Sequence, residues 1–525
     1  MSFSTQALAI LAAIIYKSLF FFSSRRSQFD MNETINALEK MFHPKAVAVI
    51  GAPRTRPSGW PGIFGCIKDY GFPGRLYPVN PGADEVEGVR AWPNLRSLPE
   101  PVDLVVISLP APAVPEALRD CAASGNKNIH IFSAGFKETG EEEGLRLHGE
   151  IENIARREGL RVIGPNCMGI HVPSKGFVTW VGASKKSGPV AFVSQSGGHS
   201  QDFTSIANRL ELYFSKVISY GNALTIDSTD LLEYLARDPE TEIITMYLEG
   251  VKDGRRLLRL VSDITRIKPV IILKAGLTEA GTRAVASHTG SLAGGEKIWK
   301  AFFRATGAVS AVNLDDMAYL AMAFRCLEGT EGLRTAVIGH GGGIAVAAAD
   351  ACSAAGLEMP QLNRDTQRKL RGWIPSGGNI IRNPVDAVPV FRNMDLFQEV
   401  LRTVTADPAI DMMIISLSLD WLFDIDEGIQ IEKVAEYLAG PARQCMNGKP
   451  FVVSWRSYRN DPRIFKVGEK MESRLLKAKI PVYRNFEQAA GSLARWAKFH
   501  LFQKSRMEQE QPEEESLHRA CSGCR

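Results

Sequence analysis

Short apolar runs recur along the chain, and amphipathic stretches long enough for helices separate them. Such runs indicate strands buried on both faces, and their alternation with helices is typical of parallel sheets in α/β proteins. They fall into three sets, so we expect three doubly wound α/β domains. The first set is Ala46–Gly51, Arg75–Asn80, Asp103–Pro110, Asn128–Gly135 and Arg161–Asn166; the second is Gly188–Gly198, Ser215–Asn222, Glu242–Gly250 and Lys268–Gly276; the third is Arg334–Gly343, Asp411–Leu419, Pro450–Trp455 and Ile480–Asn485.

The same pattern divides the 525 residues, which are too many for a single hydrophobic core. We place the three domains at residues 31–170, 171–330 and 331–500. The apolar stretch Ala7–Phe22 is short for a membrane span and lacks the features of a signal peptide. We therefore interpret residues 1–30 as an extension outside the fold, with a weak signal anchor as the alternative. Residues 501–525 are charged and polar, which predicts a disordered tail.

Composition and charge exclude several classes of protein. The chain has 62 Lys and Arg against 58 Asp and Glu, a net charge of +4, and no long basic stripe, so nucleic acid is not an expected partner. The eight cysteines are scattered, and only Cys521 and Cys524 form a CxxC pair. Without a second pair no metal site is expected, and the thiols are typical of a reduced, cytoplasmic protein.

The first apolar run leads into a loop rich in Gly, Pro and Ser, which contains Gly51, Arg54 and Ser58. Backbone N–H groups in such a loop, together with the following helix start, can hold phosphate. The loop lacks the G-x-G-x-x-G spacing of an NAD site, and the second strand ends in "YPVN", at Asn80, without an acid for the ribose hydroxyls. We predict a Rossmann-type fold for a different phosphorylated nucleotide; a plain tight turn is the alternative.

In the second set, the run "FVSQSGG" ends in Ser196, Gly197 and Gly198. At the start of a helix these residues would offer free N–H groups to an anion. The same residues resemble the nucleophile elbow of a hydrolase, with "GHGGG" (Gly339–Gly343) as its oxyanion loop. That elbow requires glycine where Ser194 stands, and its oxyanion loop precedes the nucleophile, so we set the hydrolase aside.

A single histidine, His288, comes after Lys268–Gly276, the last apolar run of the second set. It lies in a stretch of small residues, "AVASHTGSLAGG", which we interpret as a loop. No second histidine stands at metal-ligand spacing, so the remaining chemical role is that of a nucleophile that carries a group covalently. A packed or surface histidine is the alternative. A carboxylate would have to hold the ring tautomer, and Glu249, at the end of a sister strand, is the candidate.

Several motifs in order resemble those of one family, the α subunit or α half of NDP-forming acyl-CoA synthetases, which are relatives of succinyl-CoA synthetase. The resemblance covers roughly residues 35–500, and its motifs are "VIGAPRTRPSG", "GPNCMG", "FVSQSGG", "YLEGVKDGRR", "KPVIILKAG", "SHTGSLAGG" and "NPVD". It implies a first domain that binds coenzyme A and two flavodoxin-like domains after it.

The resemblance also assigns roles to individual residues. It implies that His288 is phosphorylated, that Glu249 supports it, and that Ser196 and Gly197 hold phosphate at the helix start. Two further matching positions, Asn166 and Cys167, resemble residues near the thiol end of coenzyme A.

The implied reaction joins a small carboxylic acid to coenzyme A through an acyl phosphate and a phosphohistidine, with ATP converted to ADP and phosphate. No GxxxxGK[ST] loop is present. The family's nucleotide site lies in an ATP-grasp domain, so the resemblance implies a separate β partner that holds ATP or ADP with Mg²⁺ in a hetero-oligomer. A non-catalytic CoA-binding or regulatory protein of the same fold is the alternative. The acid, the nucleotide base and the direction in the cell stay open.

Overall fold

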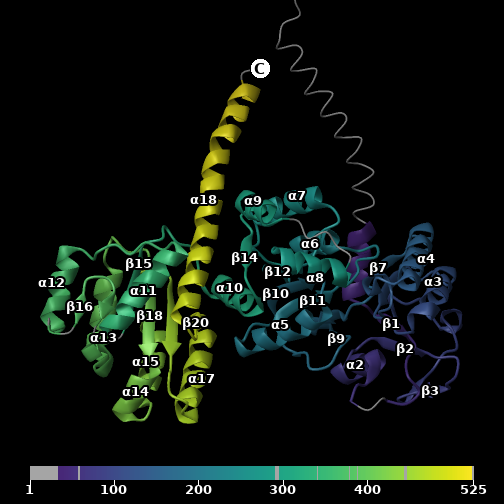
Figure 1. Cartoon of the computed structure of the whole chain (residues 1–525), viewed down its shortest axis with the longest axis horizontal. Helices are drawn as coiled ribbons and strands as arrows, with labels where there is room; N and C mark the ends of the chain where they lie inside the picture. Colours follow the sequence, from purple (N-terminus) through teal and green to yellow (C-terminus); the bar gives the residue numbers. More distant parts are fainter. Residues whose placement is uncertain are drawn as a thin grey trace, which may run out of the picture.

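Three parallel sheets, formed one after another along the chain, confirm the predicted α/β architecture (Figure 1). The computed structural model describes residues 33–56, 59–289, 295–339, 341–375, 377, 379–386, 388–442 and 446–522. The predicted extension at residues 1–30 lies outside this part of the chain. Each set of apolar runs supplies the central strands of one sheet.

The first sheet has five parallel strands in the order β2-β1-β5-β6-β7. Its central strands are rich in Val, Ile and Leu and are buried, because helices cover both faces. A short antiparallel hairpin, β3–β4, stands apart from it. The elements are β1 (Ala46–Ile50), α2 (Gly62–Tyr70), β2 (Arg75–Val79), β3 (Glu85–Val86), β4 (Val89–Arg90), β5 (Leu104–Ile107), α3 (Val114–Ala123), β6 (Asn128–Ile131), the 3₁₀ turn η3 (Lys137–Thr139), α4 (Glu142–Glu158) and β7 (Arg161–Ile163).

The second sheet has seven strands in the order β14-β13-β12-β10-β11-β8-β9, and β8 runs antiparallel to β11. The predicted boundary between residues 170 and 171 therefore falls inside β8. Its elements are β8 (Gly169–Val172), β9 (Phe177–Val178), β10 (Ser187–Ser194), α5 (Gly197–Arg209), β11 (Phe214–Ser219), α6 (Ser228–Arg237), β12 (Ile243–Leu248), α7 (Gly254–Ile264), β13 (Val270–Lys274), α8 (Glu279–Thr289), α9 (Glu296–Thr306), β14 (Val309–Ala311) and α10 (Leu314–Cys326).

The third sheet has the order β16-β17-β15-β18-β19-β20, with β16 antiparallel at one edge. Its elements are β15 (Thr335–Gly339), α11 (Gly342–Ala355), α12 (Arg364–Trp373), β16 (Ile380–Ile381), β17 (Val385–Asp386), α13 (Met394–Thr405), β18 (Met412–Ser418), α14 (Leu419–Asp426), α15 (Ile429–Ala439), β19 (Phe451–Arg456), α17 (Pro462–Lys477), β20 (Val482–Tyr483) and α18 (Phe486–Ser522).

All three sheets share one arrangement of parallel strands. When the parallel strands of each sheet are numbered in chain order, β2-β1-β5-β6-β7, β11-β10-β12-β13-β14 and β17-β15-β18-β19-β20 all give the order 2-1-3-4-5. In this flavodoxin-like order the chain reverses direction across the sheet between the first and third strands, and ligands bind beyond the carboxyl ends of the strands there. The expected sites are thus at β1/β5, β10/β12 and β15/β18.

Helix α18 corrects the prediction of a disordered tail at residues 501–525. It continues through Ser522 and lies between the third sheet and α10 of the second domain (Figure 1). Its continuation past residue 500 has contacts to support it, because Phe502 lies against Gly307 and Lys504 Nζ is 2.6 Å from Glu331. Among the described residues, no helix is both long and apolar enough to cross a bilayer.

Two buried histidines make the folded state sensitive to acid. His130 and His171 are almost completely buried, and burial lowers the pKa of each from 6.5 to about 4. Because the unfolded chain binds these protons more readily, their contribution to stability is complete above pH 6.5 and is lost as the pH falls towards 4. Each histidine should therefore lower the free energy of unfolding by about 2 kcal/mol between pH 7 and pH 5.

The matched variant is His130→Leu, which removes the titrating group from a fully buried position. Urea unfolding at pH 7 and pH 5 should give a loss that is smaller in this variant than in the wild type, by about 2 kcal/mol. An unchanged loss in His130→Leu would show that this histidine does not titrate in this range.

Candidate active site

The strongest candidate site lies at the carboxyl ends of β10 and β12, the switch point of the second sheet. β10 and β12 are neighbours in register, with Ser194 opposite Tyr247. The predicted anion-binding residues follow β10 directly, and Glu249 follows β12 directly. Two motifs more than fifty residues apart in the sequence therefore meet at one edge of the sheet, as the topology requires.

Helix α5 begins as the sequence predicts. Ser196 is its N-cap, and its Oγ accepts a hydrogen bond from the backbone N–H of His199 at 3.3 Å. A Cβ on Gly197 would lie 2.7 Å from Cγ of Met168, so the helix start approaches the first domain too closely for a larger residue. Gly198 is exposed, with open space around it. The geometry leaves this helix start accessible to an anion from the Gly198 side.

Glu249 is held beside this helix start by Gln195, the residue ahead of the N-cap. The Oε1 of Gln195 accepts hydrogen bonds from the backbone N–H groups of Glu249, at 2.5 Å, and Gly250, at 2.9 Å. The side chain of Glu249 is only 4% exposed. A carboxylate buried this deeply is a strong hydrogen-bond acceptor for a group brought to it.

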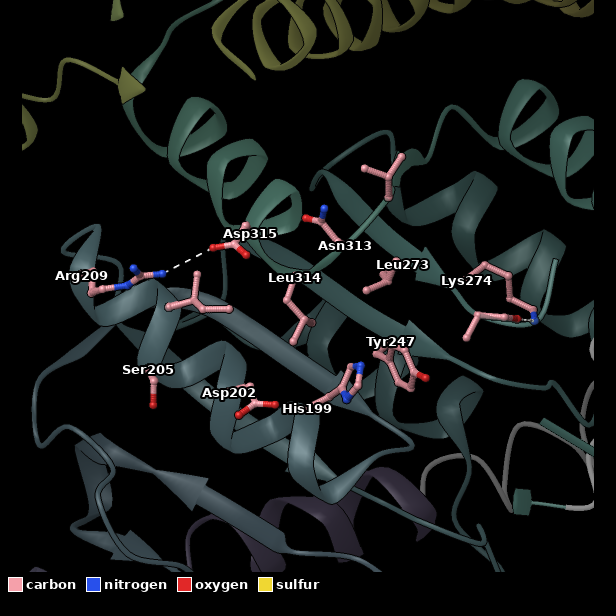
Figure 2. A pocket seen from close by; sticks show the side chains of 13 residues that line it. His199, Asp202, Ser205, Arg209, Tyr247, Leu273, Lys274, Asn313, Leu314 and Asp315 are labelled. Carbon is pink, nitrogen blue, oxygen red and sulfur yellow. Dashed lines mark hydrogen bonds and ion pairs between the residues drawn. The ribbon is translucent and has the colours of Figure 1, made fainter. Parts of the chain in front are cut away.

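One cavity of about 760 Å³ opens on the α5 side of this switch point (Figure 2). His199 and Tyr247 meet there as a ring pair, with centroids 4.3 Å apart. Burial, followed by the charge of Glu249, raises the pKa of Tyr247, so its hydroxyl stays protonated. On the opposite side of the cavity, Arg209 and Asp315 form an ion pair at 3.4 Å.

A second cavity, of about 270 Å³, lies between the first and second domains. Gln195 and Gly250 contribute to its wall from the switch point, and Lys137 and Lys252 bring two positive charges to it. Burial and the neighbouring Lys252 lower the pKa of Lys137. Asp227 also lines this cavity, and Nζ of Lys252 already donates to the carbonyl oxygen of Leu224 at 3.2 Å. The two lysines still outnumber this carboxylate, so the cavity suits a phosphate or a carboxylate.

Helix α8, which contains His288, packs against η3 of the first domain. The sequence predicts a loop around His288, but α8 extends through Thr289, so the backbone of His288 is helical. This correction has a local cause, because Ala284, Val285 and Ala286 allow a helix to continue. η3 contributes Lys137 to the wall of the second cavity. The side chain of His288 lies outside the described residues.

The predicted coenzyme A loop lies at the switch point of the first sheet. Gly51 has φ +86°, and a Cβ there would lie 2.3 Å from the carbonyl oxygen of Ser108 at the end of β5, so only glycine fits. Asn80 fixes the loop, because its Nδ2 donates to the carbonyl of Ala52 at 2.9 Å. Arg54 is exposed beside it. Ser58 lies outside the described residues.

Asn166 and Cys167 lie where the first and second domains join. Asn166 has φ +57°, and its carbonyl oxygen would be 2.2 Å from a Cβ on Gly221, so this glycine allows the two loops to pack together. Asn166 is half-buried, whereas Cys167 is 5% exposed, and burial raises the pKa of its thiol. Of these two residues, Cys167 is therefore packed inside the junction of the two domains, and Asn166 reaches the surface of that junction.

Sequence reasoning missed several residues that the fold brings to this site. Lys274 and Tyr247 were visible only as members of apolar strands, and His199 only as a histidine beside glycines. Lys252 lies inside the motif "YLEGVKDGRR", but nothing local shows that it lines a cavity, and Lys137 belongs to no motif that the sequence singled out. In the third domain, Asp386 of the "NPVD" motif accepts a hydrogen bond from the N–H of Gly341 at 2.8 Å, which links two motifs that the sequence left separate.

Family models match two parts of the chain. A CoA binding domain matches residues 45–173, and a succinyl-CoA ligase like flavodoxin domain matches residues 187–324. These two matches cover the first two sheets, including the Gly51 loop and the switch point at Glu249.

Three proteins are similar over most of the chain. The α subunit of ADP-forming acetate–CoA ligase II from Pyrococcus furiosus is 36% identical over 87% of this chain and 96% of its own length. ADP-forming acetate–CoA ligase I from Archaeoglobus fulgidus is 36% identical over 73% of this chain, but the match covers only 55% of that longer protein. The structure of dinucleotide forming acetyl-coenzyme A synthetase 1 from Ca. Korarchaeum cryptofilum, in complex with phosphate and ADP, is 29% identical, with a TM-score of 0.77 over 90% of this chain and 98% of that one.

Proposed function

Because this chain belongs to the ADP-forming acyl-CoA ligases, as a chain of the α type, we propose that it forms acyl-CoA through a phosphohistidine at His288, with Glu249 as the partner of that histidine. The observation that carries the proposal is the placement of Glu249, buried and fixed by Gln195, beside the helix start at Ser196. A buried acceptor next to an anion-binding helix start is what a phosphoryl-carrying imidazole requires.

The proposed reaction has three steps, which are two transfers of the same phosphoryl group followed by one acyl transfer. An imidazole nitrogen of His288 attacks the terminal phosphorus of ATP, and the bond to ADP breaks. A carboxylate oxygen of the acid then attacks the same phosphorus, which returns neutral His288 and leaves an acyl phosphate. Finally the thiolate of coenzyme A attacks the acyl carbon, and inorganic phosphate leaves.

Glu249 acts on the histidine through its ring N–H group. The carboxylate accepts a hydrogen bond from one ring nitrogen, which leaves the other nitrogen unprotonated and nucleophilic. The N–H groups of Gly197 and Gly198, with the dipole of α5, would stabilise the charge on the transferring phosphoryl group, whereas the predicted donor at Ser196 already bonds to Oγ of Ser194 at 3.1 Å. The cavity that Lys137 and Lys252 line is the proposed place for the small acid or its acyl phosphate.

The first domain fits coenzyme A at the loop after β1. Gly51 keeps the loop close to the sheet, Asn80 pins it, and no side chain caps the start of α2. Its N–H groups and exposed Arg54 would hold the phosphates of coenzyme A, and Ser58 belongs to the same proposed site. Asn166, at the junction of the domains, would lie towards the thiol end.

The nucleotide is proposed to bind on a separate ATP-grasp β partner, with Mg²⁺, in a hetero-oligomer. The support is the match to an α subunit along 96% of its length, whereas the longer single-chain relative continues well beyond the matched part. A cytoplasmic location stays a prediction. The relatives are ligases, so a non-catalytic CoA-binding protein is not the favoured reading.

The test of the proposed chemistry is phosphorylation from the acyl-CoA side, which needs no nucleotide. With acetyl-CoA as the probe and radiolabelled inorganic phosphate, the chain should acquire an acid-labile, base-stable label, as expected for phosphohistidine. Glu249→Gln removes a charge-assisted hydrogen bond worth about 1.5–3 kcal/mol, so labelling should slow by about one to two decades.

The matched control is Glu242→Gln, the same change beside the opposite end of β12, where the side chain is exposed. This variant should label at the wild-type rate. Equal rates in wild type and Glu249→Gln would remove Glu249 from the mechanism, and a label that survives acid would contradict a phosphohistidine.

A further inference from the structure

Lys274, the last residue of β13, is a buried lysine that the proposed mechanism does not use. Its side chain is 5% exposed although it carries an ammonium group. A lysine is rarely buried this far unless its charge has partners. In Figure 2 the side chain runs from the cavity wall away from His199 and Arg209.

The ammonium group has partners at the end of β12, in the next residue of the chain and in α9. Its Nζ donates a hydrogen bond to the carbonyl oxygen of Glu249 at 2.8 Å and another to the carbonyl oxygen of Ala275. It also lies 5.3 Å from the centroid of the Trp299 ring, within the range of a cation–π interaction. One buried charge thus joins the end of β12 and the first turn of α9 to the end of β13, while the Ala275 bond is local, to the next residue in the chain.

These segments surround the part of the chain on which the proposed chemistry depends. Glu249 is the proposed partner of His288, α8 contains His288, and α9 begins shortly after it. The Ala275 contact is local, because Ala275 directly follows Lys274, whereas the Trp299 contact lies in α9. Lys274 therefore holds the start of α9 against the strand that ends at Glu249.

We propose that Lys274 is a positioning residue for phosphoryl transfer, whose ammonium group keeps Glu249 and the start of α9 in their working arrangement. This inference rests on the proposed function. The neutral amine could still donate to both carbonyls, but these bonds would no longer be charge-assisted, and it would lose the attraction to the Trp299 ring and to Glu249.

The charge of Lys274 is also easily lost. Burial lowers the pKa of Lys274 to about 8, and the charge of Glu249 opposes this shift. Lys274 lines the cavity of about 760 Å³ described above. Other titratable groups that line this cavity are His199 and Asp202 from α5, Tyr247 from β12 and Asp315 from α10. Since a lowered pKa means loss of the proton at lower pH, the ammonium contacts are complete below pH 8 and weaken above it.

The experiment compares two lysines at the two ends of β13. Lys268 also donates to two backbone carbonyls, those of Leu235 and Asp238, but at the amino end of the strand. Lys274→Met therefore removes hydrogen bonds at the end of β13 near the site, and Lys268→Met removes similar hydrogen bonds at the far end. Labelling with acetyl-CoA and radiolabelled phosphate is measured for both variants and the wild type between pH 6.5 and 9.5.

We expect Lys274→Met to label about tenfold more slowly than the wild type at pH 7, and Lys268→Met to stay within about twofold. The ratio of the wild-type rate to the Lys274→Met rate should fall above pH 8 but stay above one, because the neutral amine keeps hydrogen bonds that methionine cannot make. This ratio cancels the titration of phosphate and acetyl-CoA, which is the same in both proteins. A merely structural role would lower the melting temperature without changing the ratio with pH.

Other outcomes would overturn the assignment. A ratio that is constant with pH, or an equal loss in Lys268→Met, shows that Lys274 only stabilises the fold. If Lys274→Met does not fold, Lys274→Arg replaces it, and its permanent charge should remove the alkaline decline. A wild type that acquires no label contradicts the proposed function itself, whereas a labelled wild type with an equally labelled Lys274→Met contradicts only this inference.

Discussion

We expect replacement of His288 with asparagine to abolish phosphorylation of the chain while coenzyme A binds as tightly as before. Asparagine keeps a polar side chain of similar size, but its amide nitrogen is not a nucleophile, so no phosphoryl group can be carried. Binding of coenzyme A is unaffected because the Gly51 loop lies on the first sheet, whereas His288 lies in α8 of the second domain. Labelling from acetyl-CoA and radiolabelled phosphate measures the first effect, and calorimetry with coenzyme A measures the second.

Two further histidines beside glycines serve as controls for this result. His199 lies in the first turn of α5, where its Nδ1 is 3.3 Å from Oγ of Ser196, so it is close enough to the helix start to compete as an acceptor. His340 follows β15 and lies outside the described residues. His199→Asn and His340→Asn should both retain the label. If His288→Asn labels normally and one of the other two does not, the phosphoryl group belongs on that histidine instead.

Purified alone, the chain should form no acetyl-CoA from acetate, coenzyme A and Mg-ATP, and addition of an ATP-grasp subunit should restore the reaction. The sequence has no GxxxxGK[ST] loop, and the three sheets of the described residues are accounted for by a CoA-binding fold and two flavodoxin-like folds. Because the proposed ATP site lies on the β partner, the transfer to His288 should lack its phosphoryl donor without that subunit, so the expected loss is complete. Release of ADP and formation of acetyl-CoA are measured together, first with the chain alone and then with the ATP-grasp subunit of a two-subunit ADP-forming ligase.

The His288→Asn variant distinguishes this chain's own activity from that of a contaminant. Any ATP turnover that persists in His288→Asn comes from another protein. Turnover by the isolated wild type that His288→Asn removes would place the nucleotide site on this chain and contradict the two-subunit arrangement.

Local patterns predicted the elements of the site but not the contacts between them. Ser196 is recognisable as an N-cap because a small hydroxyl followed by glycines closes a buried strand, and the structure places it there. The prediction of a loop around His288 was wrong. The glycines after the histidine favour a loop, but the residues before it are compatible with a helix, and the helix continues through them. The disordered tail was wrong for a related reason, because composition does not show that Phe502 and Lys504 find partners on other elements.

By itself the sequence determined the fold class, the succession of three parallel sheets and the identity of the family, because buried strands need continuous apolar runs and the motifs occur in a fixed order. It did so without long-range information, since each run and each motif is local. Only the tertiary structure decided that Gln195 holds Glu249, that Lys137 and Lys252 face one cavity, and that one ammonium group joins the end of β12 to the first turn of α9. These contacts depend on the order of strands in the sheet and on the packing of one domain against another. A lysine in a strand looks the same in sequence whether its charge meets water or a buried carbonyl, and only the fold determines which of the two it meets.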